Sequence, residues 1–428
     1  MSVRAVRAPV RVWCVFGTRP EVVKMAPVVW ALERRAGGEA QGIVPVQVFA
    51  GQHRELATGL MGELGLRPSV TLDLMNDDQQ LREYGARCLQ ALGDRMAQER
   101  PDLVLVQGDT STVLFASLAA YFQRVPVGHV EAGLRSFDPY APFPEEMMRR
   151  LTDRVAAFHF APTVGAAENL LREGSDPGGI HVTGNPVVDA VQAVAAEARE
   201  RASPEIRRWA AVEGPFVVVT LHRRESFGGG LRRVAEAIRS YAEESPTVRF
   251  IYPVHPNPAV RREVEPVLAG LDRVKLIPPV SYLDMVHLLD RCRTVLTDSG
   301  GIQEEAPALG KRVLVARDVT ERPEGVEAGW ASLVGTDPDR IVCALRHAVE
   351  HTQADGFAPG REDHGPVAEG AKHGRDLPYG DGRAGERIAD IVTSCLLGYP
   401  RTMADWRDAP SAPNRWYFSI GSSRSRRP

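Results

Sequence analysis

The stretch RVWCVFGTRPEVVK, residues 11–24, gives the first indication of the fold. An apolar run ends at Phe16, the loop sequence GTRP follows at residues 17–20, and a segment with helical spacing comes next. A buried strand, a short loop and a helix in this order form the repeating unit of parallel α/β proteins. The proline suits the first turn of a helix, where free backbone N–H groups can hold an anion beside Arg19 and Lys24. The alternative at this point is an ordinary strand–helix turn with a solvated arginine.

The rest of the chain repeats this alternation. Runs rich in Val, Ile and Leu predict strands at residues 11–16, 43–50, 103–107, 125–130, 158–161, 180–183, 216–221, 248–254, 274–277, 294–297 and 312–315. Helical spacing separates many of them, for example at residues 79–98 and 231–244. Strands and helices that alternate in this way build parallel sheets through right-handed crossovers. We therefore expect the α/β class, with two Rossmann-like domains that face one another across a cleft.

The length of the chain also favours two domains, because 428 residues are too many for one ordinary core. We expect residues 1–184 to form an N-terminal Rossmann-like domain and residues 185–383 to form a C-terminal one. Residues 398–428 contain several prolines and predict an extended tail, in which Trp406 is one side chain that could dock on the body. Residues 356–376 are rich in glycine and charge, which is typical of a loop or an insertion.

The composition excludes several classes of protein. A net charge of −3 provides no overall basic field for nucleic acid or for an anionic membrane. The five cysteines are scattered without a C-x-x-C pair, which argues against a disulfide framework or a zinc site and fits a reducing cytoplasm. The sequence lacks a signal-peptide pattern and an apolar stretch long enough to span a bilayer. It also lacks Walker A and H-E-x-x-H patterns, and Gly17 stands alone after the first strand, so we expect neither a metal nor a cofactor.

Carboxylates follow two predicted strands in the first half of the chain. Asp109 comes after residues 103–107, and Glu131 comes after residues 125–130. Because the carboxyl ends of parallel strands meet at one edge of a sheet, both side chains should reach the same cleft. Carboxyl groups at such an edge are suited to proton transfer. Asp109 has the alternative role of an ordinary helix N-cap, and Glu145 could simply begin a helix.

The segment TDSGGIQEE, residues 297–305, repeats the loop-to-helix pattern in the second half. Ser299 and the two glycine amides at 300–301 could grip a diphosphate, because glycine lets a backbone come close to a ligand. Glu305 is placed to accept ribose hydroxyls, although an acid in the first turn of a helix also stabilises the helix dipole. His222 follows another predicted strand and could donate to a phosphate oxygen.

An ordered set of motifs resembles the bacterial non-hydrolysing UDP-N-acetylglucosamine 2-epimerases. The motifs are GTRPE at 17–21, QH at 52–53, GDT at 108–110, GHVEAGLR at 128–135, PEE at 144–146, HRRE at 222–225, TDSGGIQEE at 297–305, TERPE at 320–324 and PYGDG at 378–382. The resemblance runs from about residue 11 to about residue 397, and only the tail and residues 356–376 fall outside it.

The resemblance implies a glycosyltransferase-B-like fold, in which the C-terminal domain binds UDP and a helix at about 384–397 returns to the N-terminal domain. It also implies a homodimer that interconverts UDP-GlcNAc and UDP-ManNAc. The residues that match the acid–base set of the family are Asp109, Glu131, Glu145 and His222. The residues that match substrate-binding positions are Arg19, Lys24, Gln52, His53, Arg135, His255, Ser299, Gly300, Gly301, Glu305 and Arg322.

Many members of this family bind a second UDP-GlcNAc molecule as an activator, through glutamine and basic residues. Gln52, His53 and His255 are present here, while Glu55 and Asp78 occupy two neighbouring positions. The resemblance therefore leaves activation open. The chain also departs from residues common in the family at Met148, Ser226 and Met285.

The family reaction can be rationalised from the chemistry of the sugar. The C2 proton is not next to a carbonyl, so its direct removal needs more help than one carboxylate can give. Elimination of UDP from C1 while C2 loses its proton is easier, and gives 2-acetamidoglucal, to which UDP can add back. Three alternatives stay open: a glycosyltransferase-B enzyme with a UDP-sugar donor, a hydrolysing epimerase that releases ManNAc, and an inactive sugar-nucleotide sensor.

Overall fold

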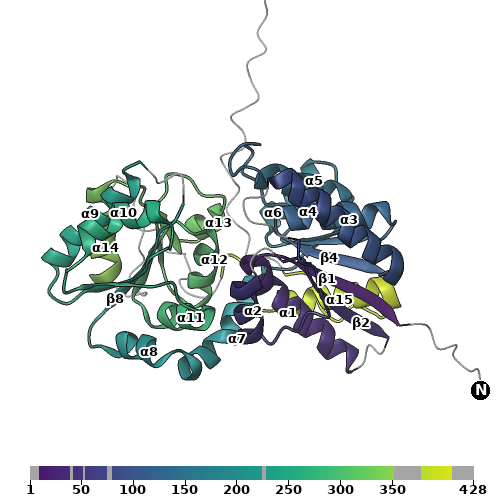
Figure 1. Ribbon diagram of the computed structural model, residues 1–428, viewed down its shortest axis with the longest axis horizontal. Coiled ribbons are helices and arrows are strands. Elements are labelled where there is room, and N and C mark those ends of the chain that lie inside the picture. The colour runs from purple at the N-terminus through teal and green to yellow at the C-terminus, as the bar shows by residue number, and fades with distance from the viewer. Residues whose placement is uncertain are drawn as a thin grey trace, which may run out of the picture.

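The computed structural model describes residues 9–38, 42–51, 54–74, 80–223, 228–350 and 377–406, and in these ranges the strands form two parallel sheets. Figure 1 shows each sheet with helices on both of its faces, as two lobes joined near the middle of the molecule. The α/β class and the glycosyltransferase-B-like arrangement expected from the sequence are confirmed. The predicted domain boundaries stay a prediction.

The first lobe is built on a seven-stranded sheet. Its strands are β1 (Val10–Phe16), β2 (Ile43–Phe49), β3 (Val70–Thr71), β4 (Leu103–Gln107), β5 (Val127–Val130), β6 (Phe158–Ala161) and β7 (Ile180–Val182), in the order β3-β2-β1-β4-β5-β6-β7. Its helices are α1 (Arg19–Ala36), α2 (Arg54–Glu63), α3 (Leu81–Glu99), α4 (Ser111–Phe122), α5 (Glu145–Val155) and α6 (Val164–Arg172), with a short 3₁₀ turn at Pro177–Gly179. The strand order reverses between β1 and β4, and ligands of open α/β sheets bind at such a point.

The second lobe is built on a six-stranded sheet. Its strands are β8 (Phe216–Thr220), β9 (Arg249–Pro253), β10 (Val274–Ile277), β11 (Thr294–Thr297), β12 (Val313–Val315) and β13 (Ala331–Leu333), in the order β10-β9-β8-β11-β12-β13. Its helices are α8 (Pro204–Ala211), α9 (Gly230–Glu244), α10 (Pro258–Leu268), α11 (Tyr282–Arg291), α12 (Gly300–Ala308), α13 (Pro323–Glu327) and α14 (Pro338–Glu350). Here the strand order reverses between β8 and β11.

One further helix joins the two lobes, and another returns to the first lobe. Helix α7 (Pro186–Arg201) packs against α1 of the first lobe and against α11 and α12 of the second, and α15 (Ala384–Leu397) packs on α1. The two segments that cross between the lobes meet where the backbone N–H of Asn185 donates to the carbonyl of Tyr379 over 2.7 Å. A Cβ atom on Gly380 would lie only 3.3 Å from the Cα of Gly184, so these crossing segments are in close backbone contact.

The first part of the expected tail packs on the body. The backbone N–H of Trp406 donates to the carbonyl of Val182 over 2.8 Å, and Asp405 accepts from the N–H of the same valine. Asp405 and Trp406 therefore lie beside β7, the edge strand of the first sheet, while the backbone N–H groups of Thr402 and Met403 donate to Asp390 of α15. These contacts explain why the segment does not form a free extension. The expectations for residues 356–376 and 407–428 fall outside the described residues. No helix in the described ranges has the length and apolar character needed to cross a membrane.

Candidate active site

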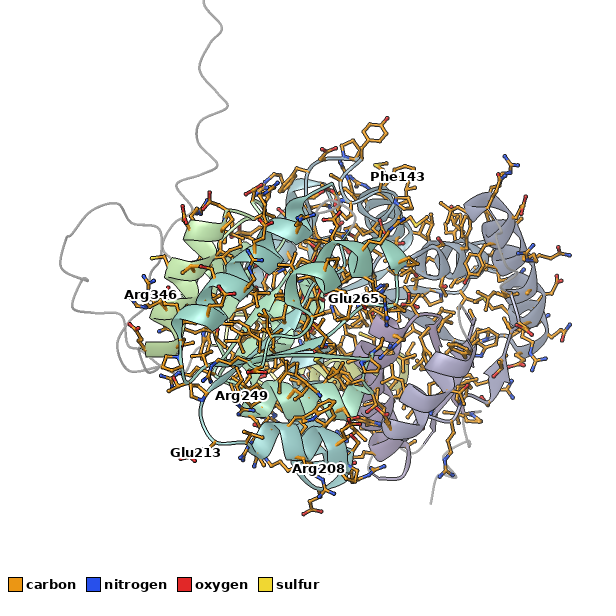
Figure 2. All side chains as sticks on the ribbon, turned by 60° about the vertical axis from the view of Figure 1, so that its left-hand side comes forward. Phe143, Arg208, Glu213, Arg249, Glu265 and Arg346 are labelled. Carbon is orange, nitrogen blue, oxygen red and sulfur yellow. The ribbon has the colours of Figure 1, made fainter. Side chains whose placement is uncertain are left out.

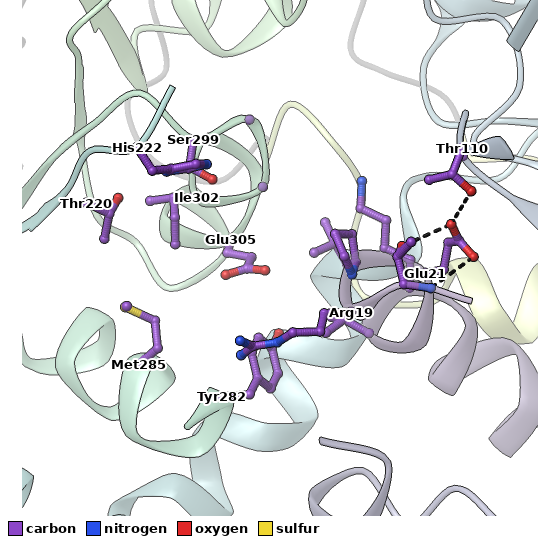
Figure 3. Close-up of a pocket in the computed structure, with 18 of the residues that line it drawn as sticks. Arg19, Glu21, Thr110, Thr220, His222, Tyr282, Met285, Ser299, Ile302 and Glu305 are labelled. Atoms are coloured by element: carbon purple, nitrogen blue, oxygen red, sulfur yellow. Dashed lines mark hydrogen bonds between the residues drawn. The ribbon is translucent and has the colours of Figure 1, made fainter. Parts of the chain in front are cut away.

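A cavity of about 890 Å³ opens between the carboxyl ends of the two sheets. Residues of both lobes line it, and Figure 3 shows Arg19 reaching from α1 toward Glu305 and Tyr282 of the second lobe. Of the sequence-predicted site residues, the cavity is lined by Arg19, Lys24, Asp109, Glu131, Glu145, His222, His255, Ser299, Gly300, Gly301, Glu305 and Arg322. Gln52 and His53 lie outside the described residues.

Glu21 fixes the loop that carries Arg19. Its carboxylate accepts hydrogen bonds from the backbone N–H of Gly17 (2.6 Å) and from the hydroxyls of Thr18 (2.9 Å) and Thr110 (2.5 Å) (Figure 3). Burial raises the pKa of Glu21 to about 7 despite these hydrogen bonds. The carboxylate thus ties the start of α1 to the start of α4, and it leaves the exposed Arg19 side chain free to face the cavity.

Glu131 is held by three donors at the floor of the first lobe. Its carboxylate accepts hydrogen bonds from the ammonium of Lys24 (2.5 Å), from the side-chain amide of Asn185 (3.1 Å) and from the side-chain amide of Gln107. The backbone of Glu131 has a φ of 68°, a left-handed conformation that is unusual for a residue other than glycine. Backbone conformations of this kind persist where the surroundings fix them, often at active sites. Neither Gln107 nor Asn185 was among the sequence-predicted site residues.

The other two predicted acids of this lobe have different surroundings. Asp109 follows β4 and accepts a hydrogen bond from Arg149 of α5, which is itself buried. Glu145 begins α5 and lines the cavity, and its side chain makes no hydrogen bond or ion pair with another described residue. The next residue, Glu146, is fully buried and accepts from the backbone N–H of Ser136 over 3.1 Å. The structure therefore separates the adjacent glutamates into one that faces the cavity and one that holds a loop.

Arg135 does not line the cavity. Its guanidinium is buried and pairs with Asp153 at 2.7 Å and with Glu173 at 2.9 Å. Asp153 in turn accepts from His129, whose other ring nitrogen lies 2.7 Å from the carbonyl of Gly108. Arg135 thus stabilises the loop between β5 and α5 through contacts outside the cavity. This placement does not favour the direct substrate contact that the sequence predicted.

In the second lobe, Asp298 orients His222. One oxygen of the Asp298 carboxylate lies 3.2 Å from Nδ1 of His222, and the other accepts the backbone N–H groups of His222 and Arg223, each at 2.8 Å. Burial tends to raise the pKa of Asp298, but the nearby His222 ring and the hydrogen bonds from the backbone N–H groups of His222 and Arg223 outweigh it and lower the pKa. The ring of His222 stacks on that of His255, with centroids 5.7 Å apart. Asp298 belongs to the TDSGG motif, so its position at the end of β11 could have identified it.

The start of α12 forms the cavity wall beside His222. Ser299 precedes the helix and lines the cavity together with the two glycines of the first turn and with Arg322. The first backbone N–H groups of a helix have no partner within the helix and are suited to bind an anion. A Cβ atom on Gly300 would lie 2.5 Å from the guanidinium of Arg322, so only glycine lets this arginine lie against the helix. Burial, and then the charge of Glu304, raise the pKa of Glu305 to about 7.

This arrangement combines two kinds of chemistry in one cavity. Besides Glu21, which holds the loop, the first lobe presents the carboxyl groups of Asp109, Glu131 and Glu145, which can exchange protons with a ligand. The second lobe presents the start of α12 with Arg322 and His222, which suits an anion such as a diphosphate. A ligand with a diphosphate at one end and, at the other, a carbon atom that exchanges a proton would contact both.

Comparisons with known proteins agree with this arrangement. The sequence model of the family described as UDP-N-acetylglucosamine 2-epimerase matches residues 37–393. The UDP-N-acetylglucosamine 2-epimerase of Yersinia pestis is 43% identical, over 88% of this chain and 97% of the relative, and that of Escherichia coli K12 is 43% identical, over 89% and 98%. The crystal structure of the Neisseria meningitidis UDP-GlcNAc 2-epimerase bound to UDP-GlcNAc aligns with a TM-score of 0.78, at 36% identity, over 91% of this chain and all of that one. The chain therefore belongs to the UDP-N-acetylglucosamine 2-epimerase family.

Proposed function

We propose that this enzyme is a non-hydrolysing epimerase that interconverts UDP-GlcNAc and UDP-ManNAc. The observation that carries the proposal is that Asp109, Glu131 and Glu145 of the first lobe line the same cavity as the start of α12. An enzyme that only transfers or hydrolyses a sugar needs the anion site but does not need several acids around C2. Epimerisation needs both, because a proton must leave one face of C2 and return to the other.

The reaction proposed here is elimination followed by re-addition. A carboxylate takes the C2 proton, the C2–H electron pair forms the C1–C2 double bond, and UDP leaves C1 with the electrons of the C1–O bond. The products of this half are UDP and 2-acetamidoglucal. UDP then adds back to C1 while an acid protonates C2 on the opposite face. We assign the proton transfers to Asp109, Glu131 and Glu145, without fixing which residue acts on which face.

The second lobe would stabilise the departing UDP. Negative charge grows on the diphosphate as the C1–O bond breaks, and donors already in place at that position lower the barrier most. We assign this role to Arg19, His222, Arg322 and the N-terminal amides of α12. Because Asp298 holds His222 through Nδ1, the other ring nitrogen of His222 is left to face the ligand.

The first prediction concerns deuterium at C2. When the protein and UDP-GlcNAc are incubated in D₂O, we expect both recovered UDP-sugars to carry deuterium at C2, because the proton passes through groups that exchange with solvent. Proton NMR follows the loss of the C2 signal and the appearance of intact UDP-ManNAc. Epimer recovered without deuterium would contradict the elimination route.

The same time course tests the rival functions. Free ManNAc in place of UDP-ManNAc would indicate a hydrolysing epimerase. Unchanged UDP-GlcNAc that is used only after an acceptor sugar is added would indicate a glycosyltransferase. Binding of UDP-GlcNAc without any change at C2 would indicate a sensor.

We also propose a homodimer in the cytoplasm. All five cysteines are free thiols, and Cys343 and Cys395 are exposed, which suits a reducing compartment. Met147 and Leu151 lie four residues apart in α5, so they share one face of this helix, and Phe143 lies just before its start; all three are exposed. An exposed apolar strip of this kind is typical of a surface that another subunit covers.

The second prediction tests this dimer. Leu151→Glu should place a charge in the covered surface and give a species of half the mass in size-exclusion chromatography with light scattering. Val212→Glu is the matched control, because Val212 is similarly exposed and adjoins Glu213, which Figure 2 shows at the opposite edge of the molecule from Phe143. A monomeric unaltered protein, or a Leu151→Glu variant that keeps its full mass, would contradict the proposal.

A further inference from the structure

A row of alternating charges, most of them buried, connects the two lobes along the wall of the cavity. Lys24 of α1 lies 2.5 Å from Glu131 and 2.9 Å from Glu304 of α12. Glu304 also accepts from Nε of Arg322 at 2.7 Å, and Arg322 pairs with Glu321 at 2.8 Å. The row thus runs from a carboxylate of the proton-transfer side to an arginine of the anion-binding side.

Glu304 is the central member of this row and does not itself line the cavity. Only 1% of it is exposed, and its two oxygens face different partners. One oxygen makes a well-formed hydrogen bond with Arg322. The other lies close to the ammonium of Lys24 without the alignment of a hydrogen bond, and has no other donor among the described residues. The interaction between Glu304 and Lys24 is therefore mainly one of charge.

Lys24 is shared between two carboxylates as a result. Burial alone would lower the pKa of Lys24, but the charges of Glu131 and Glu304 raise it, so the side chain stays cationic. Its hydrogen bond goes to Glu131, while Glu304 attracts it from the opposite lobe. The attraction between Lys24 and Glu131 then depends on how much of the negative charge of Glu304 is balanced by Arg322.

We propose that Glu304 is a positioning residue that links the diphosphate site to the proton-transfer site. A diphosphate beside Arg322 competes with Glu304 for the guanidinium. Glu304 then acts more strongly on Lys24 and draws it away from Glu131. The Glu131 carboxylate is thereby freer to accept the C2 proton when a nucleotide sugar is bound. This inference rests on the proposed elimination reaction, and it assigns a role to a residue outside the predicted catalytic and binding sets.

The third prediction follows from the chemistry of an amide at this position. Glu304→Gln keeps an oxygen for Arg322 but removes the charge that attracts Lys24. We expect kcat for epimerisation to fall about tenfold, with the affinity for UDP changed less than about threefold in isothermal titration calorimetry. Asp390→Asn is the matched control: it removes a buried carboxylate that pairs with Arg35 on α1, and should lower thermal stability without lowering kcat.

A double-mutant cycle separates this role from a merely structural one. In a Lys24→Met background, Glu304→Gln should have no further effect on kcat, because the residue through which Glu304 acts is absent. An equal tenfold loss in that background would overturn the proposal, as would a loss of UDP affinity that matches the loss of kcat.

If Glu304→Gln does not fold, Glu304→Asp takes its place. The shorter side chain keeps the charge but cannot reach both partners, so normal kcat in that variant would overturn the proposal. Failure of the elimination mechanism is distinguishable, because it would appear in the unaltered protein as product without deuterium at C2.

Discussion

Glu131→Gln should lower kcat for epimerisation by about 10²- to 10⁴-fold, the range that positioned acid–base groups contribute. The glutamine has nearly the same shape, and its one oxygen can still accept from Lys24 and Asn185, which both donate to Oε1 of Glu131. Unlike the carboxylate, it cannot take up a proton as a base. The anion-binding side is unchanged, so UDP should bind with nearly its original affinity. Proton NMR measures the rate of epimerisation, and isothermal titration calorimetry measures UDP binding.

Glu173→Gln provides a control for this variant. Glu173 is a carboxylate of the same lobe that pairs with Arg135, and it does not line the cavity. Its replacement removes an ion pair near the loop that carries Glu131 without removing a proton acceptor. If Glu131→Gln kept more than about a tenth of the activity, Glu131 would not be a proton carrier, and Asp109 and Glu145 would have to serve both faces of C2.

Much of the fold could be predicted because burial on both faces of a parallel strand leaves a continuous apolar run in the sequence. This signal located β4, β6, β10 and β11 to the residue. It missed β3 and β13, which have two and three residues and lie at sheet edges, but it found β7, which is also a three-residue edge strand. The pairing with a neighbouring strand defines β3 and β13, and their short, interrupted apolar runs do not show it.

The site was predictable to the extent that it depends on strand ends. Asp109, Glu131 and His222 each follow an apolar run, and parallel topology brings such positions together. The contacts between lobes were not predictable, because Lys24 and Glu304 are far apart in sequence and meet only when both sheets are in place. Arg135 was expected to contact the ligand because it belongs to the motif at 128–135, but its guanidinium pairs with Asp153 and Glu173 instead. A motif contains residues that support a site as well as residues that touch its ligand.

Gly300→Ala should weaken UDP binding by about 10- to 150-fold, which corresponds to the loss of about 1.5 to 3 kcal/mol for a hydrogen bond to a charged group. The new Cβ atom would lie 2.5 Å from Nη1 and 2.8 Å from Cζ of Arg322. Arg322 cannot simply swing aside, because Glu304 and Glu321 hold its guanidinium at 2.7 and 2.8 Å. The helix itself tolerates alanine, since Gly300 has no positive φ and alanine favours helices. The loss should therefore appear in binding rather than in folding.

Two other glycine substitutions identify the cause of that loss. Gly93→Ala in α3 is the control for alanine in a helix, because a Cβ atom there meets nothing within 4 Å, and UDP affinity should stay unchanged. Gly301→Ala adds a methyl group to the same helix start but only approaches Glu305, at 3.8 Å, so displacement of Arg322 is not expected. If Gly301→Ala weakened UDP binding as much as Gly300→Ala, crowding of the diphosphate against α12 would explain both losses. A loss specific to Gly300→Ala means that the position of Arg322, fixed by its contact with this glycine, determines how tightly the nucleotide is held.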